Sequence, residues 1–378
     1  MKKHLIAAAV TAAVAVPAVG QVTVSGNLDT GYATSKLTSG GDSVKFTRTG
    51  NASAMSTSTI AFGGTEDLGG GLKASFFVNN SLSTLTGALG ARDTWVQLEG
   101  GFGGIKIGRF TPAAEQTIGS FAVSGTTNMP GSVDFIFGGS TYGGTPTAGT
   151  ATTLDMRTGS GIATGINEIG RQAGNIQYTS PAFSGFKVTI GHIKTKTEAT
   201  AVITAADSGL GASTVSGKSD LTQTDVALTY SAGPLSFGVT AAKQDMQGSA
   251  TAITNKDEAD FQAVGAAYNL GPTTLRYAYI ERKDTVDGAL AFDTEIHSFG
   301  VTVPLGAVSL FAGYVDSDMA YATTANNEEG KGYQLGAVYS LSKRTNAYIM
   351  SGKDEFKVKS TGVKTKADGF AIGVRHSF

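Results

Sequence analysis

The sequence predicts an all-β fold, a 16-stranded antiparallel transmembrane β-barrel with short turns at one end and long loops at the other. From residue 21 onward, apolar and polar residues alternate with a period of two, the period of strands that have one apolar and one polar face. Tight turns alternate with long polar connections. An export signal precedes this pattern, and no later segment is apolar enough to cross a membrane as a helix.

Residues 1–20 have the composition of a signal peptide. Lys2 and Lys3 form a basic start, and the run Leu5–Val19 is apolar and rich in Ala and Val. Ala18-Val19-Gly20 supplies the small residues that a signal peptidase needs. A membrane anchor is the alternative, but it needs roughly 20 apolar residues and this run is shorter. We therefore place the cleavage after Gly20 and the barrel at 21–378.

The first and last strands of the mature chain both show the alternation. Val22–Tyr32 carries mainly Val, Leu and Tyr on one face and Thr, Ser, Asn and Asp on the other. Phe370–Phe378 carries Phe, Ile, Val and His on one face and Ala, Gly, Arg and Ser on the other. Because lipid offers the backbone no hydrogen-bond partner, the sheet must close without a free edge. Closure pairs the first strand with the last.

Short turns punctuate the C-terminal half. The segments that predict them are Ser231–Pro234, Tyr268–Pro272, Pro304–Ala307 and Ser340–Arg344. Glu66 and Asp67 are bracketed by glycines, which predicts a tight turn and not a catalytic acidic pair. Each strand with its share of the connections takes about 22 residues, which accommodates sixteen strands of the ~9–11 residues that span a membrane.

Long polar stretches alternate with these turns and predict the external loops. They lie near 35–55, 111–170, 197–220, 246–259, 284–293, 318–330 and 357–367. The third loop, 111–170, includes the low-complexity segment Gly138–Gly165 of mainly Gly, Thr and Ala. Sixteen strands enclose an aqueous lumen. The polar faces therefore predict a pore, lined by Thr, Ser, Asn, Gln and a few charges, that passes ions and small hydrophilic solutes.

Composition excludes several other functions. The chain has 29 basic and 30 acidic residues and no cysteine, so nucleic-acid binding, disulfides and thiol chemistry are not expected. The glycine clusters lack the Gly-Lys-Ser/Thr of a phosphate loop. His4 leaves with the signal peptide, and the remaining histidines share no metal-ligand spacing. They are His192, His297 and His376. We expect no metal and no cofactor.

Several segments resemble the Gram-negative general-diffusion porin family along the whole mature chain. The segments are Ser58–Ala74, Trp95–Arg109, Arg171–Phe186, Tyr339–Thr345 and Gly373–Phe378. The resemblance implies a homotrimer in the outer membrane, in contact with lipid and lipopolysaccharide. It also implies that the third loop folds into the barrel and constricts the pore, and that Phe378 belongs to the signal read by the barrel assembly machinery.

The family places acidic residues of the third loop opposite arginines of the wall. Here the acidic candidates are Glu115 and Asp134, and the wall candidates are Arg92, Arg109 and Arg171. Strand parity conflicts for two of them, because Arg92 shares a face with Val96 and Leu98, and Arg109 shares one with Ile105 and Ile107. Trimer contacts on these strands would account for an outer face that carries arginine.

Other basic residues have a clear parity. Lys187, Arg276 and Arg375 lie on the polar faces of their strands and are expected to line the lumen. They favour a weak anion preference, whereas Thr59 stands where the family usually has arginine and reduces it. The residues expected to face lipid are Val226, Leu228, Phe237, Val239, Ile372 and Val374.

Two other classes of function compete with a pore. A barrel enzyme, such as a lipase or protease, needs a nucleophile with a base in reach, and no such motif is present. A soluble all-β adhesin or lectin would need no alternation of short and long connections. Within the first class, a phosphate- or sugar-specific porin remains an alternative to a general-diffusion porin.

Overall fold

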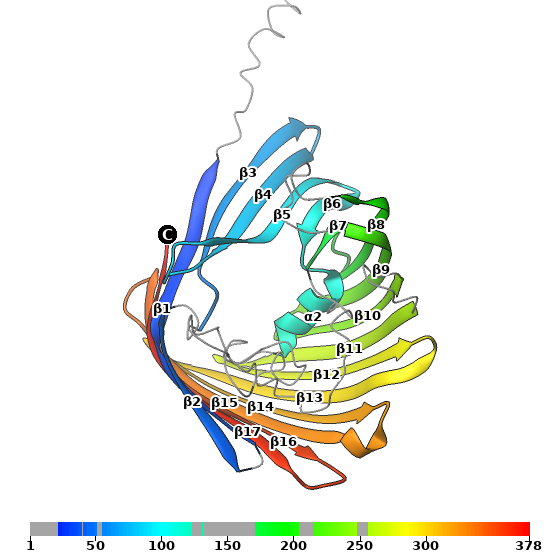
Figure 1. Ribbon diagram of the computed structural model, residues 1–378. Coiled ribbons are helices and arrows are strands. Elements are labelled where there is room, and N and C mark those ends of the chain that lie inside the picture. The colour runs from blue at the N-terminus through cyan, green and yellow to red at the C-terminus, as the bar shows by residue number, and fades with distance from the viewer. Residues whose placement is uncertain are drawn as a thin grey trace, which may run out of the picture.

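The structure, a computed structural model, describes residues 22–39, 41–50, 55–122, 131, 171–203, 215–247 and 256–378. Seventeen strand segments form one antiparallel sheet that closes on itself. Figure 1 looks into the resulting ring, with α2 inside it. The predicted signal peptide 1–20 lies outside the described residues, as does Asp134. In the described part, no helix is long and apolar enough to cross a membrane.

The strand segments differ widely in length. They are β1 Thr23–Ser39, β2 Asp42–Gly50, β3 Thr59–Gly69, β4 Leu72–Leu82, β5 Leu89–Gly100, β6 Gly103–Phe110, β7 Gln172–Thr179, β8 Phe186–Ile203, β9 Val215–Ala232, β10 Leu235–Gln247, β11 Lys256–Leu270, β12 Thr273–Val286, β13 Ala289–Leu305, β14 Val308–Tyr321, β15 Glu328–Ser340, β16 Thr345–Val358 and β17 Lys364–Ser377. Among the described residues the helices are α2 Ala113–Phe121 and the short 3-10 helix Thr324–Asn326.

The barrel closes between β1 and β17, as predicted. Residues Asn27–Ser39 of β1 pair with β17. Gly26 and the terminal Phe378 exchange two backbone hydrogen bonds of 3.1 Å, which extends the closure to the end of the chain. Neither end of the sheet is therefore left as a free edge.

The other edge of β1 pairs with two segments in turn. Residues Thr23–Asn27 pair with β3 and residues Gly31–Ser39 pair with β2. The two segments therefore share one position in the ring, and seventeen segments form the predicted sixteen-stranded barrel. Asp29 stabilises the junction between β2 and β3 from the inner face. Its carboxylate accepts hydrogen bonds from Ser56 N at 2.7 Å and from Tyr348 Oη at 2.8 Å.

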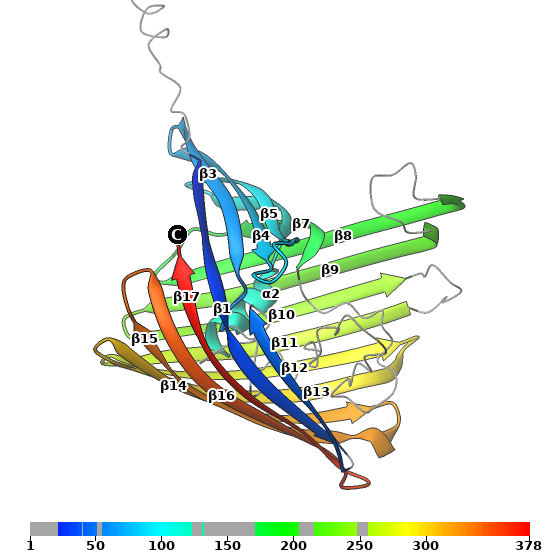
Figure 2. The ribbon, with the colours of Figure 1, turned by 60° about the vertical axis from the view of Figure 1, so that its left-hand side comes forward.

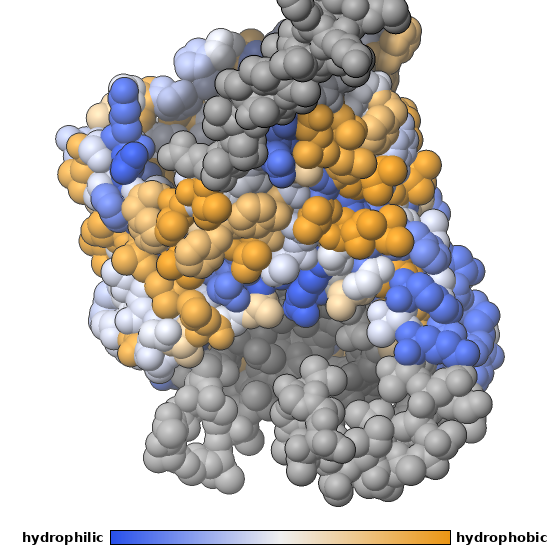
Figure 3. Space-filling model, turned by 90° about the horizontal axis from the view of Figure 1, so that it is seen from above, coloured by the Kyte–Doolittle hydropathy of each residue, from blue (hydrophilic) through white to orange (hydrophobic). Residues whose placement is uncertain are grey.

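Apolar side chains cover the outer face, as the alternation predicts. Val226, Leu228, Val239, Ile372 and Val374 are all exposed there, between 38% and 49%. Figure 3 shows a belt of apolar side chains on the outer surface, with hydrophilic side chains beside it. This belt is the surface that contacts lipid in a transmembrane barrel.

The walls of the barrel differ in height. β8 and β9 have 18 residues each, whereas β6 and β7 have 8 residues each. Figure 2 shows β8 to β13 extending well beyond the segments on the side of β3 to β7. We call β3 to β7 the low wall and β8 to β13 the tall wall. The third loop leaves β6 and returns to β7, so it starts from the low wall.

Most of the predicted external loops are shorter than expected, because their polar residues lie in strands. The 35–55 stretch contains the hairpin of β1 and β2, and the 284–293 stretch contains only a tight turn at Asp287–Gly288. Where strands extend past the apolar belt, their outer face is polar. On their outer face lie cross-strand ion pairs such as Lys357–Glu329 and Lys366–Glu355. Polarity there reflects exposure to water and not the absence of a strand.

Glu66 and Asp67 also lie in a strand. They occupy the last residues of β3, and the turn itself is formed by Gly70 and Gly71, both at positive φ. Asp67 Oδ1 accepts the backbone N–H of Gly69 at 2.9 Å, which helps the chain into the turn. Glu66 and Asp67 therefore precede the tight turn, whereas the sequence predicted that they form it.

Part of the inner face is apolar, which the alternation did not predict. Phe261, Ile280, Ile296 and Met319 occupy inward positions and are at most 4% exposed. They belong to one cluster with Ala114 and Phe121 of α2. The reason is packing: a helix that lies inside a barrel needs an apolar surface to cover.

Candidate functional site

Helix α2 lies inside the barrel, against the tall wall (Figure 1). It begins two residues after Thr111 and contacts β8 to β12. Gly238 and Gly265 lie beneath it, and a Cβ at either position would come within 2.6 Å of Thr117 or Phe121. These wall glycines let the helix approach the sheet closely. The third loop therefore folds inward, as expected.

Hydrogen bonds from two strands hold the ends of α2. Asp225 of β9 is 1% exposed, and its Oδ2 accepts the backbone N–H of Ala113 at 2.7 Å. No side chain of the helix's own N-cap, Pro112, takes that role. At the other end, Ser298 Oγ of β13 donates to the carbonyl of Ala122 at 2.9 Å. The wall thus supplies both caps that the helix lacks.

The third loop is also attached far from α2. Gly131 N donates to Oδ1 of Asp354, a residue of β16 that is fully buried. Gly332 lies directly opposite Asp354 on β15, and a Cβ there would meet Asp354 Oδ1 at 2.2 Å and Gly131 Cα at 2.9 Å. Six strands separate β9 from β16. Two buried acidic side chains therefore hold the described parts of the loop, Ala113 and Gly131, on well-separated parts of the wall.

A group of charged side chains surrounds the start of the loop. Arg171, just before β7, forms an ion pair with Asp93 of β5 and donates from Nη2 to Thr111 Oγ1 at 2.8 Å. Arg171 therefore clamps the two ends of the loop to the wall. Arg92 lies within electrostatic reach of Asp93, Arg171 and Glu115. The structure thus brings together three of the predicted residues: Arg92, Arg171 and Glu115.

A β-bulge resolves the parity of Arg92. Val78 of β4 pairs with Thr94, but Asn80 pairs with Ala91, so Arg92 and Asp93 together oppose a single residue. The extra residue shifts the alternation, and Arg92 leaves the outer face that Val96 and Leu98 share. The sequence carries no signal for this insertion.

Arg109 does not join the group. It pairs with Thr94 and lies on the face of Ile105 and Ile107, which are 41% and 53% exposed on the outside of the barrel. The alternation of β6 is regular up to this position, so the Arg109 side chain points away from the lumen. The expectation that Arg109 forms part of the basic wall is therefore corrected.

The three other basic candidates lie on inward positions. Lys187 alternates with Phe186 and Val188, which are exposed on the outer face. Arg276 shares its face with the buried Ala278 and donates from Nη1 to Thr302 Oγ1 at 3.1 Å. Arg375 lies between the outward Val374 and His376.

Sequence reasoning missed Asp93, Asp225 and Asp354. Each is an acidic residue at an inward position of a strand. A side chain that merely faces water in the lumen could equally be Thr or Ser, so an acidic residue there was a signal that it binds a partner. Asp225 shares its face with Ala227 and Thr229 in the predicted pattern. What the sequence did not contain is the partner, a backbone N–H of a loop more than one hundred residues away.

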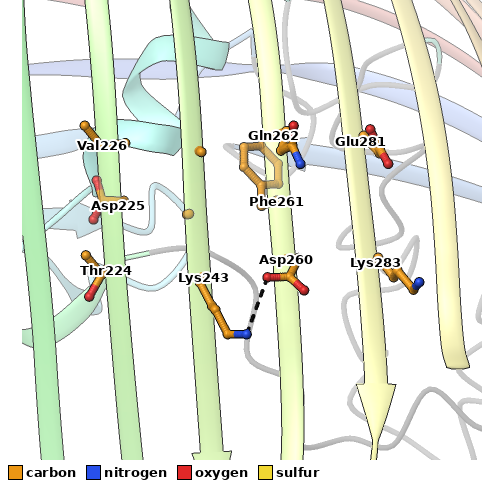
Figure 4. A pocket seen from close by; sticks show the side chains of 11 residues that line it. Thr224, Asp225, Val226, Lys243, Asp260, Phe261, Gln262, Glu281 and Lys283 are labelled. Atoms are coloured by element: carbon orange, nitrogen blue, oxygen red, sulfur yellow. Dashed lines mark ion pairs between the residues drawn. The ribbon is translucent and has the colours of Figure 1, made fainter. Parts of the chain in front are cut away.

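The outer surface carries a hollow of about 460 Å³ over β9 to β12. Figure 4 shows its lining with Lys243 and Asp260 in an ion pair of 3.9 Å, and with α2 on the other side of the strands. The hollow therefore faces away from the lumen. Among the residues that the structure describes, no group of three His, Asp or Glu side chains is arranged to hold a metal ion.

Comparison with known proteins gives consistent results. The model of the Gram-negative porin family matches residues 7–359. Outer membrane porin protein 32 of Delftia acidovorans is 28% identical over the full length of both chains. The major outer membrane protein P.IB of Neisseria meningitidis is 38% identical over 120 residues, which are 31% of this chain and 36% of that protein.

Solved structures share the fold. An anion-selective porin from Comamonas acidovorans superposes with a TM-score of 0.67 at 24% identity, over 95% of this chain and all of that one. The outer membrane channel DcaP of Acinetobacter baumannii superposes with a TM-score of 0.62 at 12% identity, over 95% and 97% of the two chains. At these identities the likeness concerns the barrel alone.

Proposed function

The chain belongs to the Gram-negative porin family, and on that premise we propose that it is a general-diffusion pore with a slight preference for anions. Family and fold make it an outer-membrane channel for passive diffusion, and a channel rather than an enzyme. The finer claims concern the constriction, the selectivity and the assembly. The observation that carries them is the attachment of two described parts of the third loop, Ala113 at Asp225 and Gly131 at Asp354, on separate parts of the wall.

The constriction is formed by the third loop, 111–170, and the wall beside its base. Glu115 on α2 lies within electrostatic reach of Arg92, which in turn neighbours Arg171 and Asp93. An acidic residue on the loop and arginines on the wall produce a transverse field across the narrowest part of the passage. Charges in such a narrow, water-filled site of low surrounding dielectric act strongly on passing ions. Asp134 remains a second acidic candidate of this loop.

The slight anion preference follows from the charges of the inner face. Lys187, Arg276 and Arg375 occupy inward positions away from the constriction, and Arg92 adds positive charge near it. The related structure from Comamonas acidovorans is described as anion-selective, which supports the same sign here. Asp93 neutralises part of Arg171, and Thr59 contributes no charge, so the preference is small.

Reversal potentials under a KCl gradient test this proposal. The wild type should favour chloride slightly, Arg92→Gln should shift the reversal potential toward cations, and Glu115→Gln should shift it toward anions. Arg109→Gln is the matched control, because its side chain lies on the outer face and should leave the potential unchanged. Equal reversal potentials for all four proteins would remove the charged constriction but not the channel.

Targeting and assembly complete the proposal. Residues 1–20 are removed as a signal peptide after Gly20, and the mature barrel assembles as a homotrimer in contact with lipid and lipopolysaccharide. Phe378, whose backbone closes the barrel against Gly26, marks the chain for the barrel assembly machinery. N-terminal sequencing of protein purified from outer membranes tests the cleavage site, which predicts Gln21 as the first residue.

A further inference from the structure

The inner faces of β4, β5 and β6 carry a cluster of aromatic rings around one lysine. Phe77 and Trp95 lie on paired positions with ring centroids 5.7 Å apart. The Lys106 ammonium lies 4.1 Å from the ring centroid of Phe110 and 5.6 Å from that of Trp95. We call Phe77, Trp95, Lys106 and Phe110 the aromatic shelf. Trp95 of the shelf follows Arg92 and Asp93 along β5, toward the turn between β5 and β6.

A glycine makes room for this arrangement. Gly108 pairs with Trp95 across β5 and β6, and a Cβ at Gly108 would lie 3.0 Å from the Cβ of Trp95 and closer still to the β5 backbone. With no side chain at Gly108, β5 and β6 lie close together, and the Lys106 ammonium lies over the rings of both Trp95 and Phe110. The rings hold the ammonium group over the shelf through cation–π attraction.

The lysine has no anionic partner within the described structure. No carboxylate of the described residues lies within ion-pair distance of Lys106, although several lysines of the outer face are paired. Asp93 acts on it only at longer range, and is itself paired with Arg171. A half-buried, unpaired ammonium in the wall of a pore is a site that an anion can neutralise.

Polar groups next to the lysine also lack partners. Gln177 of β7 pairs directly with Lys106, and Asn175 pairs with Gly108. Both are buried, and neither Gln177 Nε2 nor Asn175 Oδ1 has a hydrogen-bond partner among the described residues. Buried polar atoms in folded proteins are nearly always satisfied, by protein, water or a ligand. These two amides therefore indicate a polar occupant beside Lys106.

From this geometry we propose that the aromatic shelf is a binding site for small aromatic carboxylates on their way through the pore. The carboxylate pairs with the Lys106 ammonium, and the ring packs against the half-buried faces of Trp95 and Phe77. Ring contact adds to the attraction that every anion experiences, so the site discriminates benzoate from acetate or chloride. The inference rests on the proposed pore, since the ligand reaches the shelf through the lumen.

Trp95 makes the proposal directly measurable, because it is the single tryptophan of the chain. Benzoate added to the folded, detergent-solubilised protein should change the tryptophan fluorescence saturably, under red-edge excitation where benzoate is transparent. Acetate at equal concentration and ionic strength should change it far less. Lys106→Met keeps the length and apolar stem of the side chain but removes the charge. It should raise the half-saturation concentration about tenfold, as for the loss of one charge-assisted hydrogen bond.

Lys243→Met is the matched control, since Lys243 lies on the outer face of β10, away from the lumen and the shelf. It should keep the half-saturation concentration of the wild type. Equal responses to benzoate and acetate, or an unchanged response in Lys106→Met, would overturn the site.

Planar bilayers give a second readout that does not depend on the fluorescence of one residue. Benzoate should reduce the KCl conductance of the wild type, and it should do so less in Lys106→Met and in Trp95→Leu. A wild type that conducts KCl but does not respond to benzoate would overturn the shelf alone. A folded wild type without KCl conductance would overturn the proposed pore.

Discussion

Two buried carboxylates fix the position of the third loop. Asp225 accepts the first backbone N–H of α2, and Asp354 accepts that of Gly131. Each interaction is a hydrogen bond from a backbone N–H to a buried carboxyl oxygen, and a buried group that loses such a partner is costly. The loop is thus held at these two points by its backbone. Its side chains can therefore differ, and alter the selectivity, without loss of these two attachments.

Removing one of these acceptors should loosen the loop without opening the barrel. Asp225→Ala deletes the cap of α2, and the loss of an N-cap costs about 0.5–2 kcal/mol. We expect larger fluctuations of the open-channel current and little change in the thermal stability of the barrel. Asp245→Ala, on the outer face of the neighbouring β10, is the control. A steady current in Asp225→Ala would show that the loop is held mainly by its apolar contacts.

At the residue scale, the sequence predicted which face a side chain occupies but not which partner it meets. Parity placed Lys187 and Arg276 inward, since their strands alternate regularly. It failed to place Arg92, because the bulge at Arg92 and Asp93 depends on pairing with β4 and leaves no local pattern. The contacts of Asp225 and Asp354 depend on the path of a loop that has no period at all.

At the scale of elements, all strands show the same alternation of outward apolar and inward residues, and specific contacts stabilise the places where this pattern breaks. The second position of the ring is split into β2 and β3, and Asp29 with Ser56 and Tyr348 holds the junction from inside. Elsewhere the turns at the short end contain glycine at positive φ, as at Gly271 and Gly306. These turns were predictable, because such a conformation favours glycine.

The apolar belt should tolerate no charge on its outer face. Leu228 is 38% exposed on the outside of β9, and the neighbouring Thr229 points inward. An arginine facing lipid near the midplane costs ~2–4 kcal/mol. Leu228→Arg should therefore fold poorly into liposomes, as measured by the heat-sensitive mobility shift on gels, while Thr229→Arg should fold normally. Similar losses in both variants would contradict the assignment of the two faces.

The ends of the strands were harder to predict than their centres. A strand that continues past the belt has water on its outer face, so that face carries charged residues like those of a loop. Charge pairs such as Lys357–Glu329 and Lys364–Glu355 connect neighbouring strands there. Only the pairing partner distinguishes such a strand from a polar loop, and the partner is not part of a local sequence pattern.

For the whole molecule, the low wall from β3 to β7 differs from the rest of the outer surface. Its strands are short, and its outward residues include the apolar Val96, Ile105 and Ile107. Arg109 lies among them. An arginine on a lipid-facing surface is costly, whereas one in a protein interface can find partners. We therefore expect a neighbouring protomer to pack against the low wall.

A trimer assembled through the low wall makes a specific prediction. The wild type should migrate as a heat-sensitive oligomer in cold detergent gels, and light scattering in mild detergent should give the mass of three protomers. Ile107→Arg places a second charge beside Arg109 and should release folded monomers. Val239→Arg, on the tall wall, is the matched variant: it should lower the yield of folded protein, but the folded part should remain oligomeric.

If the wild type has the mass of a single protomer, the barrel acts alone and Arg109 must meet lipid headgroups instead of protein. If both variants remain oligomeric, the protomers associate through a different wall. In either case each barrel would still enclose its own lumen, because closure between β1 and β17 involves no neighbour.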